Sequence, residues 1–328
     1  MYGYELFHEE LMKPLIHAAQ HNEAGHAYIF EGAPGLFKHN AAQLFAAALT
    51  CLSPASAPCG QCAACVKSKS GTNPDIIHVN SGGKKSISVD TIRGLLSDAY
   101  VKPFEANKKV YIIEDAPSMT EQAQNAFLKL LEEPPAYAVF ILIASNSAML
   151  LQTVLSRCSI IRFEPISDDA VRAYIRRAFP DETGRLELLV KYARGIPGAL
   201  SDIIGDPDFE QLRTEALAKI PALFSKRLLS AYAISDFLEA HKDRAELILE
   251  FWLQFIRDVM LEQQGNSASI LNVDKIDSIK SMAGSIDEKL VITALERILE
   301  AKSMLRKNVK LQALSHHMSF LIKKQLQS

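Results

Sequence analysis

The first half of the chain alternates short apolar runs with segments that have helical periodicity. Five runs of four to six residues are mostly apolar and β-branched, at residues 27–31, 75–79, 110–113, 139–144 and 159–163. Continuous apolar runs of this length are typical of strands buried on both faces, as in a parallel sheet. Because helical segments separate the runs, the sequence predicts a doubly wound α/β domain over residues 1–165.

The hydrophobic pattern changes after Pro165. Ser167 precedes two acids and apolar residues at helical spacing, which predicts a capped helix in a small helical unit over residues 166–207. Beyond residue 208 the apolar positions recur with helical spacing and without strand alternation. We therefore expect a third domain, all-α, over residues 208–328.

Composition and charge narrow the class of protein. No apolar run approaches the ~20 residues that a membrane-spanning helix needs, and the N-terminus lacks the pattern of a signal peptide. The formal net charge of -2 argues against a protein that coats DNA through a globally basic surface. We expect a cytoplasmic protein without a membrane partner.

Four of the five cysteines crowd into one short segment, as Cys51-x7-Cys59-x2-Cys62-x2-Cys65. Two-residue gaps let successive sulfurs converge on one centre, and four thiolates suit a tetrahedral structural Zn²⁺ site. An iron–sulfur cluster and free thiols are the alternatives. Because the chain itself supplies four ligands, no position would remain open for catalysis at this metal.

A glycine-containing loop follows the first predicted strand and precedes a helical run. A P-loop requires G-x-x-x-x-G-K-[ST] in that context. Counted from Gly32, the loop also contains Gly35 and keeps the lysine as Lys38, but Phe37 replaces the second required glycine and His39 replaces the Mg²⁺-binding hydroxyl. The segment is interpreted as a degenerate P-loop, and a loop that never bound nucleotide is the alternative.

The strand at residues 110–113 ends in two acids, Glu114 and Asp115. A buried strand with terminal acids resembles a Walker B motif, although the usual order is Asp-Glu. The reversed order places the longer side chain at the metal position. Acids at the end of a strand are also common on solvent-facing edges, so an ordinary surface role stays open.

Two later motifs also have both a structural and a functional interpretation. The segment NAFLKLLEEPP at 125–135 predicts a helix that Pro134 ends, with Ser118 and Glu121 as a candidate capping box. Arg157, in Ser-Arg-Cys, is either a surface salt-bridge partner or an arginine finger offered to a phosphate of a neighbouring subunit.

Taken together, these motifs resemble the AAA+ subunits of the bacterial clamp loader, the gamma/tau and delta-prime subunits of DNA polymerase III. The resemblance is dense over residues 5–165 and diffuse beyond. It rests on HAYIFEG at 26–32, the four-cysteine segment, Asn73-Pro74-Asp75, Ile92-Arg93, VYIIEDA, NAFLKLLEEPP and Ser156-Arg157-Cys158.

The resemblance implies an AAA+ parallel-sheet domain with an inserted four-cysteine zinc module at about 51–65, a helical lid domain and a helical collar domain that serves oligomerisation. The departures at Phe37, His39 and Glu114-Asp115 match delta-prime, for which no productive ATP binding and no intrinsic ATPase are expected. Gly198 stands at the place of the sensor-2 arginine. An active gamma/tau-type ATPase and a zinc-bearing nucleic-acid-binding module are the alternatives.

The resemblance also implies partners and a site in trans. The chain would act as a stator in a hetero-pentamer with gamma/tau and delta subunits, part of the DNA polymerase III holoenzyme that places a sliding clamp on primed DNA. Arg157 would point into the ATP site of the adjacent gamma/tau subunit. The clamp and the primed DNA would be indirect partners.

Overall fold

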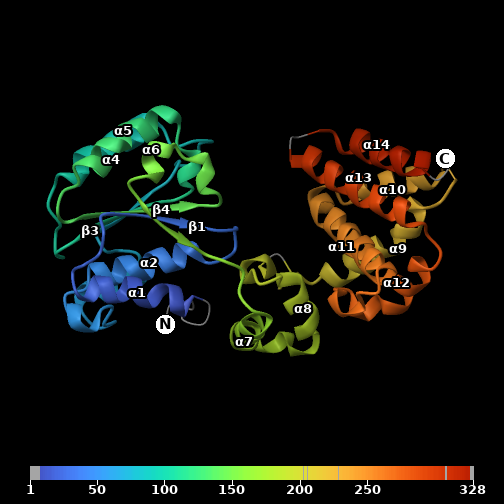
Figure 1. Ribbon diagram of the computed structural model, residues 1–328, viewed down its shortest axis with the longest axis horizontal. Coiled ribbons are helices and arrows are strands. Elements are labelled where there is room, and N and C mark those ends of the chain that lie inside the picture. Colours follow the sequence, from blue (N-terminus) through green and yellow to red (C-terminus); the bar gives the residue numbers. More distant parts are fainter. Residues whose placement is uncertain (1–7, 202, 205, 228, 307–308, 326–328) are drawn as a thin grey trace. The chain divides into compact units, whose positions relative to one another are not determined.

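The computed structural model describes residues 8–306 and 309–325, apart from residues 202, 205 and 228. No helix in this described part is long and apolar enough to cross a membrane. The chain divides into two compact units (Figure 1). The first unit is Met1–Leu186 with Ala193–Ser201, and the second is Glu187–Tyr192 with Asp202–Ser328. The three-domain division of the chain stays a prediction.

The first unit is built on a five-stranded parallel sheet with the strand order β2-β3-β4-β1-β5. The strands are β1 (Ala27–Glu31), β2 (Ile76–Val79), β3 (Lys109–Ile113), β4 (Ala138–Ala144) and β5 (Ser159–Arg162). The predicted α/β fold is confirmed, and each strand lies within one residue of its expected bounds.

Helices cover both faces of this sheet (Figure 1). Val110 and Ile112 of β3 face the core beneath α1 and α2, whereas Tyr111 and Ile113 face the core beneath α4 and α5. Alternation on a strand thus supplies two apolar faces, each closed by its own helices. The helices of this unit are α1 (Glu9–Gln20), α2 (Lys38–Leu49), α3 (Ala63–Ser70), α4 (Val89–Ala99), α5 (Glu121–Glu132), α6 (Gln152–Leu155) and α7 (Asp168–Ala178).

Of the two helix caps predicted from the sequence, one is confirmed and one is wrong. Ser167 caps α7 as predicted, because its hydroxyl accepts a hydrogen bond from the Ala170 N–H at 3.3 Å. The predicted cap of α5 at Ser118 is wrong. Thr120 accepts from the Ala123 N–H at 3.2 Å, while Ser118 ends a separate 3₁₀ turn, η2 (Ala116–Ser118).

The described part of the second unit is helical and contains no strand, as predicted beyond residue 208. Arg213, only 2% exposed, organises its interior by donating to Asp274, Asn272 and the Tyr192 hydroxyl at 2.7–3.0 Å. The helices are α8 (Leu186–Ala193), which joins the two units in sequence, and α9 (Phe209–Leu223), α10 (Leu229–Ala240), α11 (Ala245–Gln263), α12 (Ile276–Ala283), α13 (Glu288–Arg306) and α14 (Leu311–Gln325).

Candidate functional site

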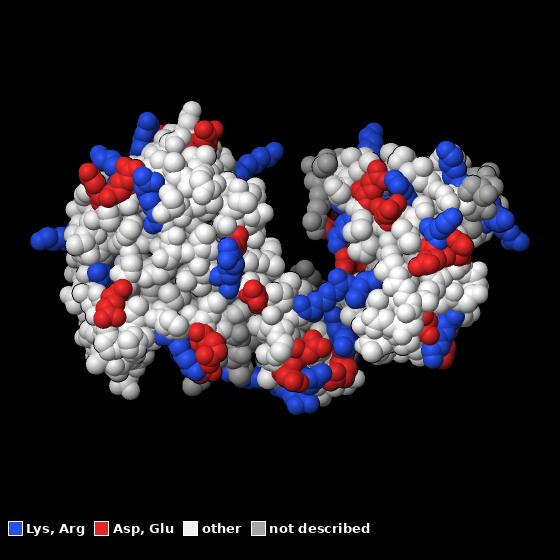
Figure 2. Space-filling view, in the orientation of Figure 1, with Lys and Arg blue, Asp and Glu red and all other residues white. Residues whose placement is uncertain are grey.

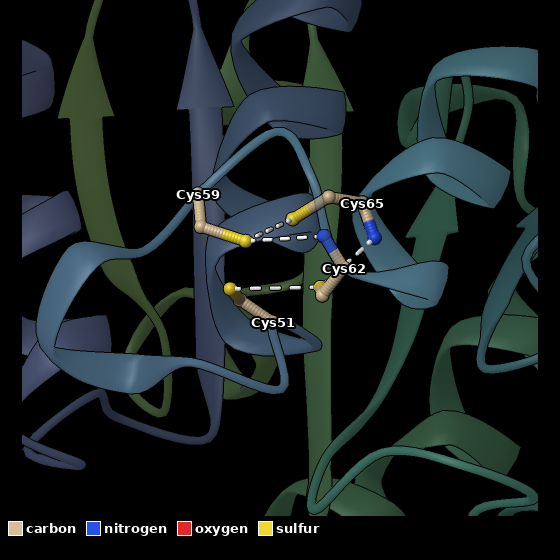
Figure 3. Close-up of side chains that lie close together, drawn as sticks. All are labelled: Cys51, Cys59, Cys62 and Cys65. Carbon is tan, nitrogen blue, oxygen red and sulfur yellow. Dashed lines mark hydrogen bonds between the residues drawn. The ribbon is translucent and has the colours of Figure 1, made fainter.

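The four clustered cysteines form a compact sulfur cluster (Figure 3). Cys51 follows α2, Cys62 is the N-cap residue of α3 and Cys65 lies in its first turn. The Sγ atoms of Cys51 and Cys62 are 3.9 Å apart, as are those of Cys59 and Cys65, and the four Sγ atoms lie within 4.8 Å of one another. Tetrahedral Zn²⁺ with bonds of about 2.3 Å separates its sulfurs by about 3.8 Å. The donor set therefore fits a structural zinc ion.

Backbone N–H groups point at several of these sulfurs. The Cys62 N–H donates to the Cys59 sulfur at 3.3 Å, and the Cys65 N–H donates to the Cys62 sulfur at 3.4 Å. Backbone hydrogen bonds, first from Gln61 and then from Cys62, lower the pKa of Cys59 to about 6. Burial raises the pKa of Cys51 and Cys65. A metal bound here would have to displace the protons of these last two thiols.

Asn73, from the Asn-Pro-Asp motif, holds the helices that flank the sulfur cluster. Its buried side-chain amide donates to the Ala64 carbonyl at 3.2 Å, to the Ser68 hydroxyl at 3.0 Å and to the Thr50 hydroxyl at 3.3 Å. Thr50 is the C-cap of α2, and Ala64 and Ser68 belong to α3. Asn73 therefore has a structural role, because it joins the two helices on either side of the cysteine segment.

The lysine of the degenerate P-loop bonds to the loop itself. Lys38 begins α2, and its ammonium donates to the carbonyls of Gly32 at 2.5 Å and Ala33 at 2.8 Å. Only 7% of the residue is exposed, and burial lowers the pKa of its amine. Phe37 keeps a left-handed backbone, with φ +54°, where the P-loop pattern has glycine. The loop therefore keeps the bend of a P-loop, but the Lys38 ammonium is hydrogen-bonded to carbonyls of the loop itself.

A second segment closes over the same loop. The Gly198 N–H, in the 3₁₀ turn η5 (Pro197–Leu200), donates to the Gly35 carbonyl at 3.0 Å. A Cβ atom on Gly198 would lie 2.4 Å from the Gly35 Cα, closer than any real contact, and Gly35 itself has φ +89°. Position 198 therefore has no room for any side chain, including the sensor arginine that the resemblance would place there.

Glu114 lies between two histidines at the carboxyl end of β3. Its Oε1 atom is 3.1 Å from Nδ1 of His78 and 3.4 Å from Nδ1 of His39. The neighbouring Asp115 is exposed and has a left-handed backbone, with φ +51°. The sequence singled out Glu114 and His39 and missed His78. The available signal was a histidine near the end of β2, the strand that pairs with β3.

Arg157 brings two of the sequence motifs into contact. Its Nη2 atom lies 2.9 Å from Oε1 of Glu132, the first acid of the LLEEPP motif at the end of α5. Its Nη1 atom donates to the Thr153 carbonyl at 2.9 Å and to the Ser156 hydroxyl at 3.3 Å. The Arg157 side chain keeps 36% of its surface exposed. Beside it, burial raises the pKa of Cys158 to about 12, as suits a thiol packed against the core.

The predicted site residues thus fall into separate groups. The four cysteines form one group, Glu114 joins His39 in a second, and Arg157 pairs with Glu132. On the face displayed in Figure 2, basic and acidic side chains are interspersed over each unit. An extended basic stripe, which a general nucleic-acid-binding surface would need, is not seen on that face.

Two family models match this chain. One is described as "DNA polymerase III, delta subunit" and matches residues 7–167, and the other, its C-terminal counterpart, matches residues 207–313. They cover the sheet unit and most of the helical region.

Individual relatives agree with the family models. The DNA polymerase III subunit delta' of Bacillus subtilis is 30% identical over 316 residues, which are 95% of each chain. The tau subunit of the same organism is 31% identical over 77% of this chain and 48% of its own length. A solved gamma subunit-related protein of Thermotoga maritima covers 94% of this chain and 99% of its own, with 19% identity and a TM-score of 0.41. By its full-length similarity, the chain belongs to the delta-prime family of DNA polymerase III clamp-loader subunits.

Proposed function

We propose that this chain is a delta-prime subunit without ATP hydrolysis, which serves as the stator of the clamp loader. The proposal rests on the hydrogen bonds that the degenerate P-loop makes within this chain. Lys38 donates to two carbonyls of its own loop, and the Gly35–Gly198 contact closes over it. A phosphate would have to break both sets of bonds before it reached the loop amides.

The partners follow from membership in the clamp-loader family. The chain assembles with gamma/tau and delta subunits in a hetero-pentamer in the cytoplasm, and this ring loads the sliding clamp on primed DNA. The helical second unit serves as the collar that holds the ring. Zn²⁺ bound by Cys51, Cys59, Cys62 and Cys65 has a structural role, because the four thiolates leave no open coordination position.

Arg157 supplies an arginine finger to the ATP site of the adjacent gamma/tau subunit. Two features support this role: the guanidinium is partly exposed, and its partner Glu132 is itself 52% exposed. An ion pair at such exposure contributes little stability, so a phosphate can replace the carboxylate at small cost. Fingers of this kind accelerate phosphoryl transfer by about 10³–10⁵.

Titration of the purified chain with a fluorescent ATP analogue and Mg²⁺, up to millimolar concentration, tests the central claim. The proposal requires that no saturable binding is seen. Tight Mg²⁺-dependent binding would instead favour an active ATPase of the gamma/tau type and would overturn the stator assignment. The isolated ATPase subunit is the positive control in the same assay.

A further inference from the structure

His39, His78 and Glu114 converge from three elements of the fold. His39 lies in the first turn of α2, His78 on β2, and Glu114 directly after β3. One donor atom from each lies within 4.8 Å of the others, and both Nδ1 atoms face the same carboxylate oxygen, Oε1 of Glu114. His78 and Glu114 meet because β2 and β3 are parallel neighbours, and His39 lies at the same carboxyl end of the sheet because α2 begins after the loop that follows β1.

From this convergence, the geometry points to a second metal site, in which His39, His78 and Glu114 bind a divalent transition metal of the Zn²⁺ type. Two imidazoles and one carboxylate are the protein ligands of open zinc sites. With metal–ligand bonds of about 2.0–2.1 Å, tetrahedral geometry separates the donor atoms by about 3.3 Å. The observed separations of 3.1 and 3.4 Å between the histidine nitrogens and Oε1 agree with that value.

The surroundings also favour a transition metal over Mg²⁺. His39 occupies the position at which the P-loop pattern has a Mg²⁺-binding hydroxyl. Imidazole suits Zn²⁺, Ni²⁺ and Cu²⁺, whereas Mg²⁺ prefers oxygen. Lys38 does not compete for the carboxylate, because its ammonium donates to Gly32 and Ala33.

The three side chains are 30–44% exposed, so a metal ion can enter from solvent and a fourth ligand, such as water, can complete its shell. The ion would join α2, β2 and the end of β3 at the carboxyl end of the parallel sheet. This inference does not depend on the arginine finger or on the absence of ATP binding.

Co²⁺ titration of the full-length chain loaded with a single equivalent of Zn²⁺ tests this site, because the four-thiolate cluster takes up that zinc and leaves the second site open. We expect calorimetry to show one further saturable equivalent of Co²⁺ bound per chain. The visible absorption spectrum should contain the weak bands of nitrogen and oxygen ligation and no thiolate charge-transfer band. His78→Ala and Glu114→Gln should each weaken this binding by more than about tenfold. Because both side chains are exposed in part, neither variant should unfold the sheet.

His17→Ala is the matched control, since His17 and His21 form another exposed histidine pair, stacked at 4.0 Å on α1. The inference predicts unchanged Co²⁺ binding in this control. Absence of a further equivalent in the wild-type chain would overturn the site. So would binding that survives His78→Ala, or that disappears with His17→Ala.

Discussion

The contact between Gly198 and Gly35 makes a quantitative prediction for Gly198→Ala. The added methyl group would meet the Gly35 Cα at 2.4 Å, whereas carbon atoms pack at about 3.5–4.0 Å. Backbone on one side must therefore move by more than about 1 Å. Overpacking of this kind costs about 1–3 kcal/mol. For a unit of this size, each kcal/mol lowers Tm by about 2–4 °C, so we expect a loss of about 2–12 °C.

The two units can be followed separately in one experiment. Trp252 is the only tryptophan, is fully buried, and belongs to the second unit. Thermal unfolding followed by its fluorescence reports that unit, while thermal unfolding followed by far-UV circular dichroism reports both. Gly198→Ala should shift the dichroism transition that belongs to the first unit and leave the Trp252 transition in place.

Gly94→Ala is the control for adding one methyl group. Gly94 lies inside α4, where a Cβ would meet nothing within 4 Å, so alanine should stabilise the helix by about 0.5–1 kcal/mol. If Gly198→Ala had the same Tm as the wild-type chain, the close contact between Gly198 and Gly35 would be refuted. An equal shift of the Trp252 transition would refute the assignment of the effect to the first unit.

Three further predictions address the remaining groups. Arg157→Ala should leave the ring assembled but slow single-turnover ATP hydrolysis at the neighbouring site by about 10³-fold or more. Arg162 is an exposed arginine on β5, and Arg162→Ala should leave this hydrolysis rate unchanged. An unchanged rate in the Arg157 variant would exclude the arginine finger. Cys62→Ser should release Zn²⁺ and destabilise the first unit, and wild-type protein without zinc by mass spectrometry would contradict this. Burial lowers the pKa of His8 below its ordinary 6.5, so the unfolded chain binds this proton more tightly. Its contribution to stability should be complete above pH 6.5 and decline below it, and His8→Gln should flatten the decline in pH-dependent urea unfolding.

Local sequence was sufficient for the strands and for the sulfur cluster. The apolar runs of β1, β3 and β4 have one physical explanation, because a continuous apolar strand needs cover on both faces and these three strands are buried along almost their whole length. The Cys-x2-Cys-x2-Cys spacing brings sulfurs together within a few residues, so little of the chain has to fold before they meet. Ser167 could likewise be identified as a cap from its neighbours alone.

Contacts between residues far apart in the chain had no such signal. Gly198 touches Gly35 across more than 160 residues, and nothing near either glycine in sequence indicates that their backbones meet. Arg157 contacts Glu132 because of the way the helices pack, and His78 contacts Glu114 because their parallel strands pair. A residue's own neighbours set its backbone preferences and its chemistry. Which side chains meet at one edge of the sheet depends on strand order, and strand order results from the cooperative burial of the whole domain.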